Sequence, residues 1–138
     1  MIGKAIGHFT VKLEPQPALI QADAAVIGRR TLDKSFFGNL EASSCGEMMA
    51  VMTAVEGSMA YVALEKVTGT LGGRFGEFIL QHASLMVRGE PFQTIRVVPD
   101  SGTHELLGLH GDMRIDIKDN EHCYFFEYKL SIQDGILE

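Results

Sequence analysis

Residues 59–87 read MAYVALEKVTGTLGGRFGEFILQHASLMV, and this stretch decides the fold class. Two mainly apolar segments of strand length flank the pair Gly72-Gly73. Both glycines tolerate the positive φ that a two-residue hairpin turn requires. The stretch therefore predicts two antiparallel strands, over residues 59–71 and 75–87.

Strand-like segments continue on both sides of this hairpin. Apolar or small residues alternate with polar ones through residues 5–13, which is the period of a strand, and Pro15 and Pro17 are expected to end it. Further strands are predicted over residues 26–37, 40–52, 92–98, 105–117 and 122–132. The strand over residues 40–52 allows a break near Ser43 and Ser44. Residues 18–25 fit a loop, a short helical turn or an irregular edge.

Eight successive strands joined by tight turns indicate an all-β protein with an antiparallel meander. About eight strands close into a small barrel around their own side chains or one small ligand. Closure also removes the exposed edges that an open meander leaves. We expect one barrel domain over residues 1–138, with a two-sheet sandwich as the alternative.

Composition limits the partners of this chain. It has 138 residues, 46% of them hydrophobic and 22% charged, which suits one globular core. The net charge is −6 and the 12 basic residues are scattered, so neither a nucleic acid nor an anionic membrane is an expected partner. The first residues lack the apolar run of a secretory signal, and the longest apolar run is too short to span a membrane. A cytoplasmic protein with two reduced cysteines, Cys45 and Cys123, is expected.

Three strings of the sequence stand out, namely LEKVTGTLGGRFGEFILQH at residues 64–82, VVPDSGTHELLGLHG at residues 97–111 and HCYFFEY at residues 122–128. They strongly resemble a bacterial family called domain of unknown function 3224. The family pattern tends to have Gly where His104 stands and Leu-Asp where Phe126-Glu127 stands. The resemblance covers nearly the whole chain and implies a barrel similar to that of allene oxide cyclase, which dirigent-type proteins share. Those relatives guide cyclisation or coupling of reactive small molecules and tend to form oligomers, whereas this family implies no activity of its own.

Motifs for cofactors and metals are weak in this chain. The glycines at 69, 72, 73 and 76 lack the following helix that a phosphate-binding loop needs. The five histidines form neither a His-x-His pair nor a set with Cys-x-x-Cys. Cys123 adjoins His122, but successive strand residues face opposite sides, so this adjacency does not activate the thiol. We expect no metal, no cofactor and structural cysteines.

Polar residues inside apolar strands are the candidates for ligand binding. They are Glu65, Gln81, His82, Tyr124, Glu127 and Tyr128. A carboxylate that faces a barrel interior is destabilising unless it is paired or protonated, so a buried one is either structural or suited to acid–base work. Alternation places Glu65 on the face of Tyr61 and Val67, and it places Gln81 and His82 on opposite faces. The pattern does not say which face is interior.

Apolar residues on both faces of three strands point to a partner. Val62 and Leu64 oppose Tyr61 and Val67, and residues 75–87 and 122–132 repeat this pattern. A second apolar face needs a cover, which self-association provides. The seven methionines fit core filling, an adaptable pocket or an interface.

Three functions are compatible with these observations. The first is an oligomeric barrel that binds a small apolar or amphipathic molecule in or at its mouth. The second is an enzyme of cyclase or isomerase type, in which Glu65, Glu127 or His82 moves a proton. The third is a structural oligomer with a solid-packed barrel. An interior carboxylate with a raised pKa favours the second function, and a filled barrel favours the third.

Overall fold

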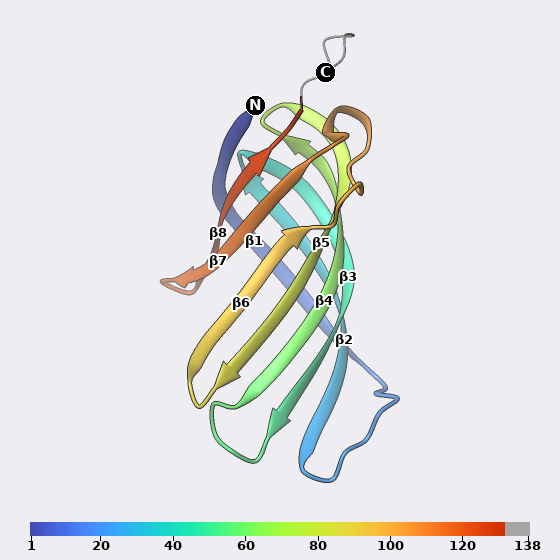
Figure 1. Cartoon of the computed structure of the whole chain (residues 1–138), viewed down its shortest axis with the longest axis vertical. Helices are drawn as coiled ribbons and strands as arrows, with labels where there is room; N and C mark the ends of the chain where they lie inside the picture. The colour runs from blue at the N-terminus through green and yellow to red at the C-terminus, as the bar shows by residue number, and fades with distance from the viewer. Residues whose placement is uncertain (132–138) are drawn as a thin grey trace.

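The computed structural model describes residues 1–131 and shows a closed antiparallel barrel of eight strands in sequence order (Figure 1). The strands are β1 Ile2–Gln16, β2 Ala25–Gly38, β3 Leu40–Thr53, β4 Met59–Leu71, β5 Arg74–Val87, β6 Glu90–Val97, β7 His110–Lys118 and β8 Glu121–Lys129. The barrel closes where β1 pairs with β8 as well as with β2. The predicted closed meander is thus confirmed. Among the described residues, no helix is long and apolar enough to span a membrane.

The predicted central hairpin is present. Gly72 and Gly73 have φ values of +57° and +84°, as the turn requires. Residues 18–24 form a loop, and β3 runs through Ser43 and Ser44 without a break.

The first strand ends directly before Pro17, as predicted, but Pro15 does not end it, because β1 continues to Gln16 and Pro15 pairs with Arg30. In the described structure β1 pairs with β8 only as far as Phe9. Beyond Phe9, β1 is an edge strand, and an edge tolerates a residue without an N–H donor.

The predicted start of the seventh strand is also wrong. His104–Leu106 form a 3-10 turn (η1), and β7 begins at His110. The preceding segment lies against the upper part of β5, where the side chains of Ser101, Thr103 and Glu105 accept hydrogen bonds from the N–H groups of Ile79, Glu77 and Phe75. These side chains, with the N–H groups of Val98 and Thr103 that donate to the Ile79 and Glu77 carbonyl oxygens, cover this edge in place of a strand. β8 ends at Lys129, and Ile132 of the predicted strand lies outside the described residues.

Large side chains fill the barrel between β1, β7 and β8 on one side and β3 to β5 on the other. Phe78 stacks on Phe126 with ring centroids 5.9 Å apart, and Phe126 contacts Tyr128 at 5.4 Å. The other fully buried large residues include Phe36, Leu40, Leu71, Leu80, Leu106 and Leu109. This part of the interior is a packed core.

The other end of the barrel is open. β6 and β7 pair at Arg96 and Asp112 alone among the described residues, so β2 to β6 continue beyond the core as a sheet that β7 and β8 do not reach (Figure 1). On the inner face of this extension, Met52 and Met59 are exposed. The extension therefore has two accessible faces.

The Tyr124 hydroxyl ties β8 to the β2–β3 turn. It accepts a hydrogen bond from the Leu40 N–H at 2.9 Å and lies 3.0 Å from the Phe37 carbonyl oxygen, to which it donates. We expect Tyr124→Phe to lower the free energy of unfolding by about 1–3 kcal/mol, because both backbone groups lose their partner in a largely buried place. Urea unfolding measures this change, and a loss below about 0.5 kcal/mol would contradict it.

Candidate functional site

Four polar side chains meet inside the barrel, where the core gives way to the open end. Glu65 of β4 is fully buried, and its Oε1 lies 3.1 Å from Lys34 Nζ of β2 and 2.8 Å from His82 Nε2 of β5. Ser44 Oγ of β3 donates to Glu65 Oε2 at 2.6 Å. Lys34, Ser44, Glu65 and His82 are together called the polar cluster below.

Strand register explains why these residues meet. Lys34 lies directly opposite Ser44, and Gly46 lies directly opposite Glu65. His82 pairs with Ala63, which places it diagonally beside Glu65 on the same face. Gly46 allows β3 and β4 to approach closely beside Glu65, since a Cβ there would overlap the Leu64 carbonyl oxygen.

The polar cluster keeps Glu65 ionised. Burial raises the pKa of a carboxyl, but the hydrogen bond from His82, the Lys34 charge and the hydrogen bond from Ser44 outweigh it and lower the pKa of Glu65 from 4.5 to about 2. The Lys34 ammonium also lies 4.8 Å from the centre of the Phe9 ring, a favourable cation–π distance. The two charges are thus paired and largely satisfied within the protein.

One atom of the polar cluster lacks a partner. His82 Nδ1 is buried and makes no hydrogen bond to any described residue. An ionised carboxylate only accepts hydrogen bonds, so Glu65 requires the proton on His82 Nε2. In the neutral form of the ring Nδ1 is then a bare acceptor, and an acceptor left unpaired in a buried place costs about 1–3 kcal/mol of stability.

The inner face beyond the polar cluster is mostly apolar and rich in methionine. Tyr61 lies one step nearer the open end, with its ring centroid 6.2 Å from that of His82, and its hydroxyl accepts a hydrogen bond from Gln93. Burial and the Glu65 charge raise the pKa of Tyr61, so its hydroxyl stays neutral. Alternation from the buried positions places four methionines on the same inner face, namely Met48, Met52, Met59 and Met86.

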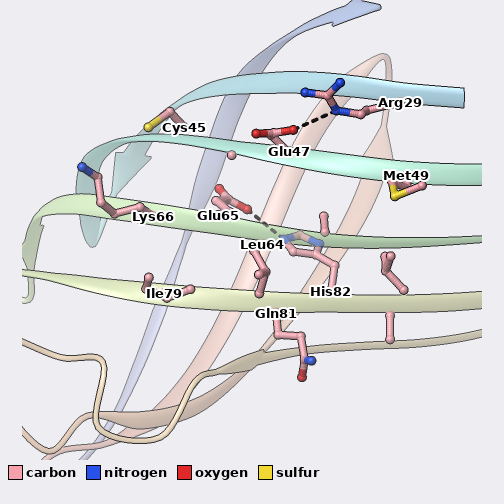
Figure 2. Close-up of a pocket in the computed structure, with 14 residues that line it drawn as sticks. Arg29, Cys45, Glu47, Met49, Leu64, Glu65, Lys66, Ile79, Gln81 and His82 are labelled. Carbon is pink, nitrogen blue, oxygen red and sulfur yellow. Dashed lines mark hydrogen bonds and ion pairs between the residues drawn. The ribbon is translucent and has the colours of Figure 1, made fainter. Parts of the chain in front are cut away.

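The opposite, outer face of the same sheet carries a groove. It has a volume of about 700 Å³ and lies over β2 to β5 (Figure 2). Its walls are mainly apolar, with Met49, Val62 and Leu64 among the lining residues, and the Arg29–Glu47 ion pair lies along one side. Glu65 is among the lining residues of this groove, but its carboxylate lies on the inner side of the sheet, where Lys34 and Ser44 bind it.

The structure separates the six predicted ligand-binding residues. It brings Glu65 and His82 together in the polar cluster. Tyr124 and Tyr128 are buried in the packed core away from the polar cluster. Gln81 and Glu127 are exposed and belong to outward-facing positions. Sequence reasoning missed Lys34 and Ser44. Lys34 shares its face of the strand with the apolar Leu32 and Phe36, a pattern that marks an inward-facing cation.

The other sequence candidates lie apart from any site. Cys45 and Cys123 are free thiols, exposed and half-buried, on β3 and β8. Within residues 1–131, no three His, Cys, Asp or Glu side chains are placed to hold a metal ion.

The fold defines this chain as a small antiparallel barrel protein with a polar cluster at one end of its core. Residues 5–128 match the family described as Protein of unknown function (DUF3224), and the chain belongs to this family. A crystal structure of a protein with unknown function from the DUF3224 family of Shewanella oneidensis MR-1 is 45% identical and superimposes with a TM-score of 0.92. The match covers 96% of this chain and 99% of that one. No curated protein matches the chain.

A departure from the family pattern has a structural meaning. His104 adopts a φ of +52°, a conformation that glycine takes without strain. This accounts for the glycine that the family pattern tends to have at this position.

Proposed function

We propose that this protein binds a small amphipathic molecule at the open end of the barrel, as a binding protein without a chemical step. The observation that carries the proposal is His82 Nδ1, a buried acceptor that lacks a partner among the described residues. A hydroxyl or amide N–H of the ligand donates to this atom, and the apolar part of the ligand lies along the methionine-rich inner face. Methionine suits such a surface because its flexible side chain adapts to different shapes.

The polar cluster prepares His82 for this role. Glu65 holds the ring by its Nε2 and determines which nitrogen carries the proton. Lys34 and Ser44 hold Glu65 in turn. The acceptor is therefore fixed before the ligand arrives, which reduces the ordering required on binding.

A second candidate function is proton transfer, with His82 as the base. The Glu65–His82 contact of 2.8 Å favours it, because a carboxylate that orients a histidine is a recurring arrangement in enzymes. Glu65 itself is unsuited to the role of acid or base near neutral pH, since its pKa is about 2 and both of its oxygens accept hydrogen bonds. Deuterium incorporation into a bound ligand in D₂O would distinguish transfer from binding.

The test compares two probes that differ in one hydrogen-bond donor, 4-propylphenol and its methyl ether 4-propylanisole. We expect the phenol to bind and to shift the imidazole NMR signals of His82, and the ether to bind at least about tenfold more weakly, because it leaves Nδ1 unpaired. Equal binding of the two probes, or the absence of a shift at His82, would contradict the proposal.

A variant pair supports this comparison. His82→Phe should remove the preference for the phenol, whereas His110→Phe, on exposed β7, should retain it. Circular dichroism confirms that each variant folds. Native mass spectrometry of protein purified from its own host completes the test, because a co-purified mass lost on denaturation would identify the natural ligand.

A further inference from the structure

Strand pairing gathers apolar residues into a continuous patch on the outer face of the sheet extension. One row crosses β2 to β6 and is apolar in every strand: Ile27, Val51, Ala60, Leu85 and Phe92. The next row adds Met49, Val62 and Ala83, and Leu64 follows beyond it. These nine residues are called the outer apolar face below.

The outer apolar face is exposed in the isolated chain. Val62, Leu64, Leu85 and Phe92 are each 56–59% exposed although they are large and apolar. Single exposed apolar residues are ordinary, but a contiguous group on one sheet face indicates an interaction surface.

The shape of the outer apolar face suits packing against the same face of a second copy. Ala60 and Ala83 lie beside larger neighbours, so the surface is hollowed between Val62 on one side and Leu85 with Phe92 on the other. This second groove, of about 530 Å³, shares Val62 and Ala83 with the groove of about 700 Å³. Two copies related by a two-fold axis would place the Leu85–Phe92 ridge of each in the grooves of the other.

Charge favours an uncharged partner surface. The nine side chains of the outer apolar face are uncharged. Beside it Arg29 pairs with Glu47 at 3.0 Å and Arg96 with Asp112 at 2.9 Å, while Lys66 at its edge makes no ion pair with any described residue. A charged partner could therefore form few ion pairs with this surface. A second copy presents the same apolar face and buries no unpaired charge at its centre.

The area of the face agrees with a weak dimer. Each outward-facing residue covers about 32 Å², since strands lie about 4.8 Å apart and alternate residues about 6.6 Å apart, so the nine residues project onto roughly 300 Å² per copy. A standard interface buries about 800 Å² of accessible surface per partner, and a rough surface exceeds its projection. We infer that two copies of this chain pack through their outer apolar faces, sheet against sheet, and form a dimer with a micromolar dissociation constant. This dimer leaves the inner face free for the ligand.

The test is sedimentation of the full chain from about 2 to about 200 µM. We expect a monomer–dimer equilibrium, and we expect Leu85→Glu to raise the dissociation constant at least about 30-fold by placing a charge on the apolar face. Ile6→Glu is the matched control, because Ile6 is 55% exposed on β1, on the other side of the barrel, whereas Leu85 is 56% exposed. This variant should dimerise as the wild type does.

Other outcomes would overturn the inference. A monomer at every concentration would exclude the dimer, and equal effects of the two substitutions would place the contact elsewhere. The salt dependence of the dimer dissociation constant is an independent test. Each copy carries a net charge of −6, so screening this repulsion should tighten an apolar dimer as salt is raised. A dimer that weakens with salt would instead be held by ion pairs, which contradicts the proposed face.

Discussion

Glu65→Gln is expected to lower the free energy of unfolding by roughly 3–5 kcal/mol. The substitution keeps the size of the side chain but removes its charge, and Lys34, whose side chain is 6% exposed, then remains charged and unpaired in the core. The amide that replaces the carboxylate also places N–H donors where Lys34, His82 and Ser44 already donate. Urea unfolding followed by circular dichroism measures the change.

Glu47→Gln is the matched control. Glu47 also pairs with a cation, Arg29, at 3.0 Å, but its side chain is 61% exposed. Water replaces the lost interaction there, so we expect a change within about 1 kcal/mol. Similar losses of unfolding free energy for Glu65→Gln and Glu47→Gln would show that burial of the polar cluster contributes little to stability.

The polar cluster also predicts how stability depends on pH. The pKa of Glu65 is about 2 in the folded protein and about 4.5 without its partners, so the unfolded chain takes up this proton first as the pH falls. The stabilisation is complete above pH 4.5 and is lost between about 4.5 and 2, and it amounts to about 3 kcal/mol. The difference in unfolding free energy between the wild type and Glu65→Gln should therefore shrink across this range. A difference that is independent of pH would contradict the pairing.

Gly46→Ala is expected to destabilise the protein by roughly 3 kcal/mol. A methyl group at this position would overlap the Leu64 carbonyl oxygen and lie 2.8 Å from the Glu65 Cα, both on the adjacent strand β4. Backbone atoms move less readily than side chains, so β3 and β4 must separate where they hold Ser44 and Glu65. Thermal unfolding measures the effect on the fold, and the NMR signals of His82 report on the polar cluster.

Gly28→Ala provides the comparison for this substitution. Gly28 lies in strand β2, and an added Cβ meets nothing within 4 Å. Alanine restricts the unfolded chain more than glycine does, so this variant should be neutral or more stable by up to about 1 kcal/mol. Equal losses for both alanine variants would mean that close approach to β4 is unimportant.

Part of the candidate site was predictable from the sequence. Glu65 and His82 interrupt apolar strands, and alternation separated His82 from Gln81 before the interior face was known. The sequence marks Lys34 only by the strand face it shares with Leu32 and Phe36, and register alone shows that Lys34 and Ser44 meet Glu65. The tyrosines at 124 and 128 share the interior with the polar cluster, but they fill the core at a different height.

Local sequence determined the elements of this protein, because the period of a strand and the φ values of a turn depend on neighbouring residues. Residues 59–87 therefore specified their hairpin, and the family strings agreed with it. Tertiary structure alone decided which face became interior, since that depends on the pairing of β1 with β8 that closes the barrel. It also replaced the predicted start of the seventh strand, because residues 101–106 satisfy the edge of β5 with side chains. Closure is a contact between distant parts of the chain, and it converts Glu65 from a polar residue in an apolar strand into a buried, paired carboxylate.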